Sequence, residues 1–533
     1  MATFTRANAW NNGGTFDNPD LLWYAKGVGA MQGRGLDDTS SWWFYAAIHG
    51  EYVGTDGFPG WGSLPALPAV PNTPSPSDSV TNQYWDQCQH GTWFFLPWHR
   101  GYLMALEAQV RADVINLGGP STWALPYWDY FGPGNDFQIP PAFTQQNLPD
   151  GTANPLFVTG RYGPDGDGNI FVPTPAGVQQ FPNDPNFGQG TVTQDCLSND
   201  LFTGDDSNTP PPGFGGPQTG FSHTPGTFGN IESNPHNLVH VYVGGSSPDG
   251  NGGLMSDPGL AGLDPIFYLH HANIDRMWAA WNSNSANTNP TDPNWLNGPA
   301  ATGDREFVLP NPDGSAWVYT PQQMSDMSQL NYAYDSLPAV PAAPNALAGR
   351  LARLGLAAAA ASVSAGGSAA GGGSVELLGA NEQPLAITGA GASTSVKLDQ
   401  GVSAKVSASF AAAAETKSPD RVYLNLENVR GTHDASALSV YINLPDDAKP
   451  GEHPELLAGT VALFGLRRAS LKDGQHGGEG LNFVLDITKI VDELHLQNAL
   501  NTDAIHVRIV PHRRLPDAAD ISIGRVSIYR QGQ

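Results

Sequence analysis

The sequence predicts two domains of different fold class: a mainly helical domain with long loops, residues 1–340, and an all-β sandwich or barrel, residues 376–533. Charge separates them, because residues 1–340 hold 31 of the 50 acidic side chains but only 8 of the 25 Lys and Arg. All fourteen tryptophans and both cysteines lie in the same part. Apolar residues follow helical spacing there and alternate with a period of two near the C-terminus.

The first histidines of interest come from two neighbouring helical stretches. His49 ends the aromatic run SWWFYAAIHG, which predicts a helix that buries it among large side chains. Pro97 favours a helix start, so a helix from Pro97 to about Val114 would carry His99 in its first turn. His90 precedes that helix and is free to approach the same point. The alternative is a capping His90 and packed His49 and His99.

A second pair of histidines has helical spacing. Asn234 is a candidate N-cap and Pro235 a candidate first helical residue. His236 and His240 are then i and i+4 on one face, an arrangement that lets two imidazoles reach one metal ion. Two hydrogen-bonding helix histidines are the alternative.

Asp264 and Pro265 predict the start of another helix. His271 shares one face of it with an apolar stripe that includes Phe267, so His271 is expected to point inward. His270 lies about 100° away, where it would hydrogen-bond to a ligand rather than bind metal.

Together these histidines form two groups of three: His49, His90 and His99, and His236, His240 and His271. Buried imidazoles without partners are costly, so several helices that each direct one inward favour a shared ligand. All-imidazole sites suit copper, zinc or iron, and a redox-active pair of copper ions is the preferred interpretation.

Residues 341–375 are a predicted flexible linker, because this Ala, Gly and Ser stretch has too few large side chains to fold. After it, short β-branched or aromatic runs are separated by turn residues and predict about seven strands. The runs are VSAKVSASF, RVYLNLENV, ALSVYINL, AGTVALFGL, NFVLDITKI, AIHVRIVPH and ISIGRVSIYR.

Composition excludes several function classes. A net charge of −25 would repel phosphate backbones, so neither nucleic acid nor a membrane surface is an expected partner. No run approaches the roughly 20 apolar residues of a membrane span. Two cysteines cannot form a disulfide framework, and the N-terminus does not resemble a signal peptide. A cytoplasmic location is expected, with export on a partner protein left open.

Five stretches resemble the type 3 copper proteins, namely tyrosinases, catechol oxidases and molluscan-type haemocyanin units. The stretches are SWWFYAAIHG, CQHGTWFFLPWHRGYLMALE, LPYWDY, IESNPHNLVHVYVGG and DPIFYLHHANIDRMWAAW. The resemblance implies a four-helix bundle around a dicopper centre, with the two groups of histidines as copper ligands. It also implies O2 as co-substrate, oxidation of o-diphenols to o-quinones, and ortho-hydroxylation of monophenols.

The resemblance also suggests further site residues. Cys88 stands two before His90, where some relatives form a thioether bond to the histidine; the alternative is a buried thiol. Glu232 matches a glutamate that holds a water near the second copper, and Asn237 an asparagine that helps to deprotonate monophenols. A plant gate phenylalanine is replaced by Pro258, so Phe267 is expected to form the apolar wall of the pocket.

The C-terminal part resembles the tail domain of plant polyphenol oxidases, which implies a possible shield over the copper site. Tyr332 and Tyr334 match the tyrosine motif that closes the plant catalytic domain, with Arg6 as a candidate cation partner. Expected partners are small phenols and a possible copper-delivery protein. Two alternative functions remain open, a haemocyanin-like reversible O2 carrier and an o-aminophenol oxidase, and the sequence leaves the oligomeric state unknown.

Overall fold

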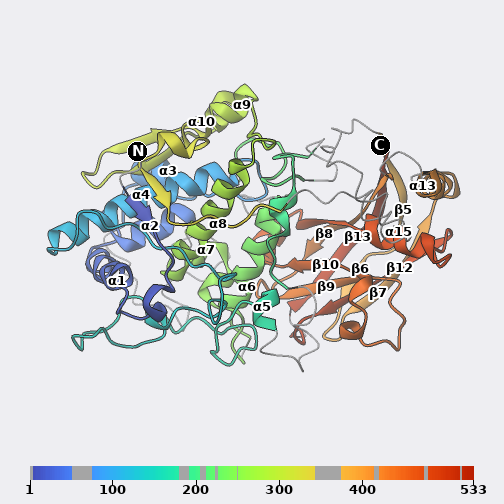
Figure 1. Cartoon of the computed structure of the whole chain (residues 1–533), viewed down its shortest axis with the longest axis horizontal. Helices are drawn as coiled ribbons and strands as arrows, with labels where there is room; N and C mark the ends of the chain where they lie inside the picture. The colour runs from blue at the N-terminus through green and yellow to red at the C-terminus, as the bar shows by residue number, and fades with distance from the viewer. Residues whose placement is uncertain are drawn as a thin grey trace.

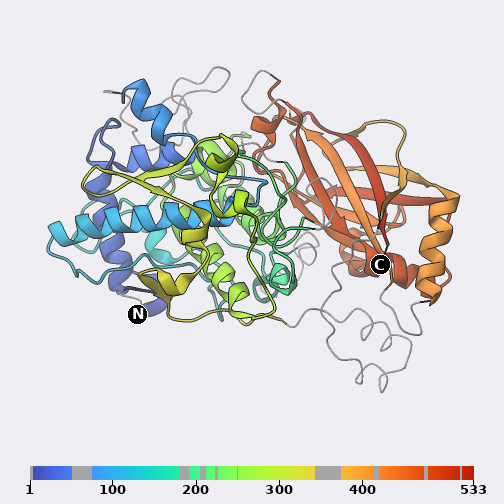
Figure 2. The same ribbon diagram turned by 90° about the horizontal axis from the view of Figure 1, so that it is seen from above.

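The structure is a computed structural model in which a helical domain lies beside a nearly closed antiparallel barrel (Figure 1). This confirms the predicted fold class. The view from above, in Figure 2, shows the same two bodies side by side. The described residues are 4–50, 75–178, 191–204, 212–222, 226–248, 250–341, 374–412, 419–472, 478–516 and 519–532.

In the helical domain, the helices α2, α4, α6 and α8 carry His49, His99, His240, His270 and His271, while His90 and His236 lie in the segments that precede α4 and α6. The α-helices there are α1 (Pro19–Gln32), α2 (Trp42–His49), α3 (Asp78–Tyr84), α4 (Phe95–Asn116), α5 (Pro175–Val178), α6 (Leu238–Gly244), α7 (Pro258–Ala261), α8 (Ile266–Ser283), α9 (Pro293–Leu296) and α10 (Pro321–Met324). The short strands are β1 (Phe4–Arg6), β2 (Phe307–Pro310), β3 (Ala316–Tyr319) and β4 (Tyr332–Tyr334).

Local capping accounts for two of the helix starts. The Ser41 hydroxyl accepts a hydrogen bond from the Phe44 amide at 3.0 Å and begins α2. The Asp264 carboxylate accepts one from the Ile266 amide at 3.0 Å and begins α8. The helix expected from Pro97 begins two residues earlier, at Phe95, which leaves the proline inside the first turn.

The segment around His236 differs from the predicted regular helix. Residues Glu232–Asn237 form a wider π-helical turn in which Asn234 is extended, and α6 begins only at Leu238. Pro235 has no amide hydrogen to continue an α-helical ladder, which accounts for the irregular turn. His236 therefore reaches the interior from this turn and His240 from α6.

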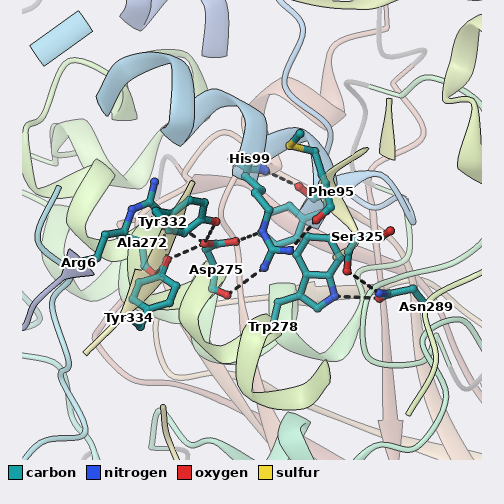
Figure 3. Close-up of polar contacts among 12 residues, drawn as sticks. Arg6, Phe95, His99, Ala272, Asp275, Trp278, Asn289, Ser325, Tyr332 and Tyr334 are labelled. Carbon is teal, nitrogen blue, oxygen red and sulfur yellow. Dashed lines mark hydrogen bonds and ion pairs between the residues drawn. The ribbon is translucent and has the colours of Figure 1, made fainter. Parts of the chain in front are cut away.

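A buried ionic network ties the first strand of the helical domain to its last (Figure 3). β1 pairs in parallel with β4, which sets Arg6 beside Tyr334. Arg6 binds Glu107 at 2.7 Å and Asp275 at 3.3 Å, and its guanidinium lies 3.8 Å from the Tyr332 ring centroid. Nearby arginines lower the pKa of Asp275 against the effect of burial. The expected cation partner of the tyrosine motif is thus in place.

In the C-terminal domain the described strands form a nine-stranded antiparallel sheet. Its strands are β5 (Val375–Ala380), β6 (Leu385–Ile387), β7 (Ala392–Leu398), β8 (Arg421–Arg430), β9 (Ala437–Ile442), β10 (Leu457–Ala462), β11 (Leu481–Asp486), β12 (Ala504–Pro511) and β13 (Ile521–Gln531). The order is β10-β9-β12-β7-β5-β13-β8-β11, with β6 paired to β13, so β10 and β11 are the two edges. Helices α13 (Gln400–Ala412), α14 (Leu466–Ser470) and α15 (Thr488–Leu496) complete the domain.

One predicted strand is wrong, because VSAKVSASF belongs to the helix α13. Val402, Val406 and Phe410 satisfy period-two alternation, but they are also spaced by four and therefore line one helical face. Val406 and Phe410 are buried from that face. Strands β5, β6 and β7 were not predicted.

Most of the predicted linker, residues 342–373, lies outside the described part of the chain. None of the described helices combines the length and the apolar character that a membrane crossing requires.

Candidate dicopper site

Three histidines of the helical domain form a regular triangle. His49 ends α2, His90 lies in the segment before α4, and His99 lies in the first turns of α4. Their ring centroids are 5.5 to 5.7 Å apart, and one potential ligand atom from each lies within 4.8 Å of the others. The geometry brings the first predicted group together.

A second cluster contains His236, His240 and His271, together with His270. The Nε2 atom of His271 lies 3.1 Å from Nε2 of His236 and 3.4 Å from Nε2 of His240. The two clusters meet where the rings of His99 and His271 stack at 4.4 Å with 16° between their planes. The His270 ring stacks on that of His236 at 5.3 Å.

Five of the six predicted ligands have their Nδ1 atom beside a hydrogen-bond acceptor. The partners are the Pro258 carbonyl for His49 (2.9 Å), the Glu232 carboxylate for His90 (2.8 Å), the Phe95 carbonyl for His99 (2.8 Å, Figure 3), the Asn237 side-chain oxygen for His236 (2.8 Å) and the Met255 carbonyl for His240 (2.7 Å). An acceptor at Nδ1 fixes the proton there and leaves the lone pair on Nε2. Each ring is thereby oriented as a metal ligand.

Burial keeps four of these imidazoles neutral. It lowers the pKa of His99 to about 3, and it lowers the pKa values of His236, His240 and His271 well below their ordinary value. A metal ion binds the neutral form of the ring, so burial prepares the ligands.

The residues fit a pair of copper ions. Nε2 of His99 is buried and has no hydrogen-bond partner among the described residues, which is costly unless a cation binds it. Each cluster offers imidazole nitrogen without thiolate or carboxylate, a donor set that suits copper. The two groups of three would hold one ion each, with His270 beside the second.

Glu232 lies against the first histidine cluster. Its carboxylate accepts hydrogen bonds from Nδ1 of His90 at 2.8 Å and from the Gly91 amide at 3.0 Å. The side chain is fully buried, and burial raises the pKa of its carboxyl well above the ordinary value. These contacts make Glu232 a positioning residue for His90, while its expected role as the holder of a catalytic water stays a prediction.

Replacing Glu232 with glutamine should lower copper affinity about 10- to 100-fold, the usual cost of losing an outer-shell partner of a metal ligand. The carboxyl group accepts from His90 through one oxygen and from Gly91 through the other, whereas the glutamine amide has only one acceptor oxygen for the two donors. Competition of the metal-loaded protein with a copper chelator measures the change. The matched control is Glu107→Gln, which alters the buried carboxylate beside Arg6 and should leave copper affinity unchanged.

Asn237 also positions a predicted ligand, because its side-chain oxygen accepts the hydrogen bond from His236. Its amide nitrogen is buried and has no hydrogen-bond partner in the described part of the structure. That N–H group is an available donor beside the second cluster.

Two phenylalanines separate the histidine clusters from the surrounding core. Phe267 is fully buried, with its ring 4.2 Å from that of His271 and 4.7 Å from that of His49. The sequence did not single out Phe95, which lies 4.6 Å from His99 and 4.7 Å from His236. Both stand one turn before a ligand on its own helix, so this shared spacing is the signal that could have identified Phe95.

An apolar crevice opens beside His90 and is lined by residues of both domains. Cys88, His90, Phe228 and Pro258 come from the helical domain, and Phe464, Gly465 and Arg468 from the barrel. The Phe464 ring stacks on His240 at 4.2 Å with 27° between their planes. Phe267 is not among the residues that line this crevice. The thioether between Cys88 and His90 stays a prediction.

Two arginines that closely follow Phe464 in the sequence form ion pairs. Arg467 pairs with Asp257, the residue before Pro258, and lies 3.6 Å from Asp434. Arg468 lies 3.6 Å from Asp86. Burial and the charge of Asp257 raise the pKa of Asp434 to about 7, against the opposing effect of Arg467.

Comparison with known proteins places these observations in context. Residues 39–284 match the common central domain of tyrosinase, and residues 374–531 match a domain of unknown function, DUF7868. Tyrosinase HcTyr1 of Hahella sp. (strain CCB-MM4) is 30% identical over 521 residues, which cover 96% of this chain and 97% of that protein. Chloroplastic catechol oxidase B of Solanum tuberosum is 30% identical over 254 residues, 47% of this chain and 39% of its own length.

Solved structures show the same two-domain fold. Latent apple tyrosinase superposes with a TM-score of 0.58 at 20% sequence identity, over 100% of this chain and 98% of that one. A recombinant latent aurone synthase gives a TM-score of 0.58 at 17% identity, over 99% and 89%.

Proposed function

Because this chain belongs to the tyrosinase family of type 3 copper oxidoreductases, we propose that it oxidises o-diphenols to o-quinones with O2 and also hydroxylates monophenols at the ortho position. The observation that carries the proposal is the Phe464 ring stacked on His240 at 4.2 Å. An aromatic ring already fits over a ligand of the second cluster, so a phenol of similar size fits there once Phe464 leaves.

In this proposal the side chains of the protein hold the copper ions and orient the groups around them, and they do not themselves react. Two copper ions bound by the six histidines would supply oxygen activation and the two-electron oxidation. In the net reaction two catechols give two o-quinones, and their four electrons and four protons reduce one O2 to two waters. The described hydrogen bonds at Nδ1 keep the histidine rings aligned throughout.

Several side chains can then act on the phenol. The free N–H of Asn237 can donate to a phenolate oxygen near His236 and so favour loss of the phenolic proton. The crevice offers Phe228 and Pro258 to the apolar face of the ring. The C-terminal domain shields the site in the intact chain, and substrate turnover requires Phe464 to move.

A reversible O2 carrier is the second candidate, since a stacked Phe464 would exclude phenols while a diatomic gas is much smaller.

The oxidase proposal predicts that the copper-loaded protein forms quinone slowly when intact and faster after cleavage within residues 342–373. Quinone absorbance is followed with 4-methylcatechol, tyramine and 2-aminophenol in parallel.

If neither form changes the absorbance with any of the three substrates, and the protein takes up O2 reversibly, the oxidase proposal is wrong and the carrier is favoured. Activity with 2-aminophenol alone would identify a narrower aminophenol oxidase. The copper content of both forms is measured as the control for an unloaded site.

A further inference from the structure

The barrel has an open seam that faces the helical domain. Its edge strands are β10 and β11, and edge strands expose backbone groups that readily pair with another segment. Thr227 of the helical domain forms a parallel bridge with Asn482 of β11. A segment that precedes the copper ligand His236 therefore extends the tail's sheet at this edge.

The residue after that bridge fills the core of the other domain. Phe228 is 4% exposed and belongs to the hydrophobic cluster of the barrel, not to that of the helical domain. Its ring lies 5.9 Å from that of Phe483 on β11. The helical domain thus contributes a side chain that the barrel core needs.

The strap that carries Phe228, residues 226–231, is itself anchored in the helical domain. The Asn230 amide donates to the Gly213 carbonyl at 2.9 Å and the Ile231 amide to the Phe214 carbonyl at 3.1 Å. A Cβ added at Gly229 would lie 2.5 Å from the Gly216 nitrogen, so the strap lies tightly on its own domain. If the domains separate, the strap cannot move with the barrel without breaking these hydrogen bonds.

At the other edge of the seam, the barrel in turn contributes a side chain to the core of the helical domain. Phe464 follows the end of β10 by two residues, is 1% exposed, and belongs to the hydrophobic cluster of the helical domain. Each domain therefore buries one phenylalanine of the other, and the two rings line the same crevice beside His90.

We infer that strap 226–231 is the docking site for the tail, and that reciprocal burial of Phe228 in the barrel and Phe464 at the histidines locks the two domains together. The inference rests on the proposed function only in taking the tail as the shield of the site. Buried aromatic residues dominate the energy of most interfaces. The Arg467–Asp257 pair contributes less, because the Arg467 side chain is 31% exposed.

The test uses the full-length chain with a specific protease site placed within residues 342–373, cleaved after folding. The two fragments of the natural sequence should stay together on size-exclusion chromatography. Phe228→Ala should make them separate about 30- to 100-fold faster after dilution, since truncation of a buried interface aromatic commonly has an effect of that order. Phe228→Leu, which keeps part of the apolar volume, should fall between them.

The matched control is Phe410→Ala, which removes a fully buried phenylalanine of the same barrel cluster that the tail supplies itself. It should lower barrel stability without accelerating separation. Fragments that separate at once in the natural sequence, or an equal rate for Phe228→Ala and Phe410→Ala, would overturn the inference. Because the readout is association, measured with and without copper, it is independent of whether any phenol is oxidised.

Discussion

Replacing His240 with alanine should remove the copper of the second site and leave that of the first. His240 faces His236 and His271, with its Nδ1 proton held by the Met255 carbonyl, and its removal leaves only two of the three predicted ligands of the second copper. We expect diphenol oxidation to fall by far more than the roughly 100-fold that loss of an outer-shell partner costs. Copper per chain, measured by elemental analysis, and quinone formation are the two readouts.

His270→Ala is the control for this result, since His270 lies in the same cluster and is equally buried. It should retain both copper ions. If His270→Ala loses copper while His271→Ala retains it, the assignment of His271 as the ligand fails, and with it the argument from the helical face.

The clustering of these histidines could be predicted because the signals that indicate it are local. The i and i+4 pair His236 and His240 can be recognised from its spacing alone. Both side chains still reach the same cluster, even though the segment forms a π-helical turn. Pro97 indicated the start of α4 to within two residues because proline fits only the first turn of a helix.

The contacts between domains could not be predicted in the same way. Phe464 lies in a run that predicts a strand. No neighbouring residue in the sequence indicates that its ring contacts His240, more than 200 residues away. Phe228 lies close to the ligands in sequence but fills a core formed by later strands. The helix α13 was missed for a different reason, because its apolar spacing fits both periods.

Replacing Phe464 with alanine should raise diphenol oxidation by the intact chain about 10- to 100-fold. The substitution removes the ring that stacks on His240 and also weakens the closed state. Truncating a buried phenylalanine costs about 3–5 kcal/mol in a protein core, and part of that energy shifts the equilibrium toward open forms. Initial rates with 4-methylcatechol, before and after cleavage within residues 342–373, measure the effect.

Phe410→Ala is again the matched control, because it destabilises the barrel without clearing the crevice. The two alanine substitutions should also differ from each other: Phe464→Ala clears the ring from His240, whereas Phe228→Ala leaves that ring in place, weakens docking of the barrel and removes one apolar side chain from the crevice wall. If intact Phe464→Ala remains as slow as the natural sequence while cleavage still activates both, the shield acts through other contacts, with the Arg467–Asp257 pair the first to examine.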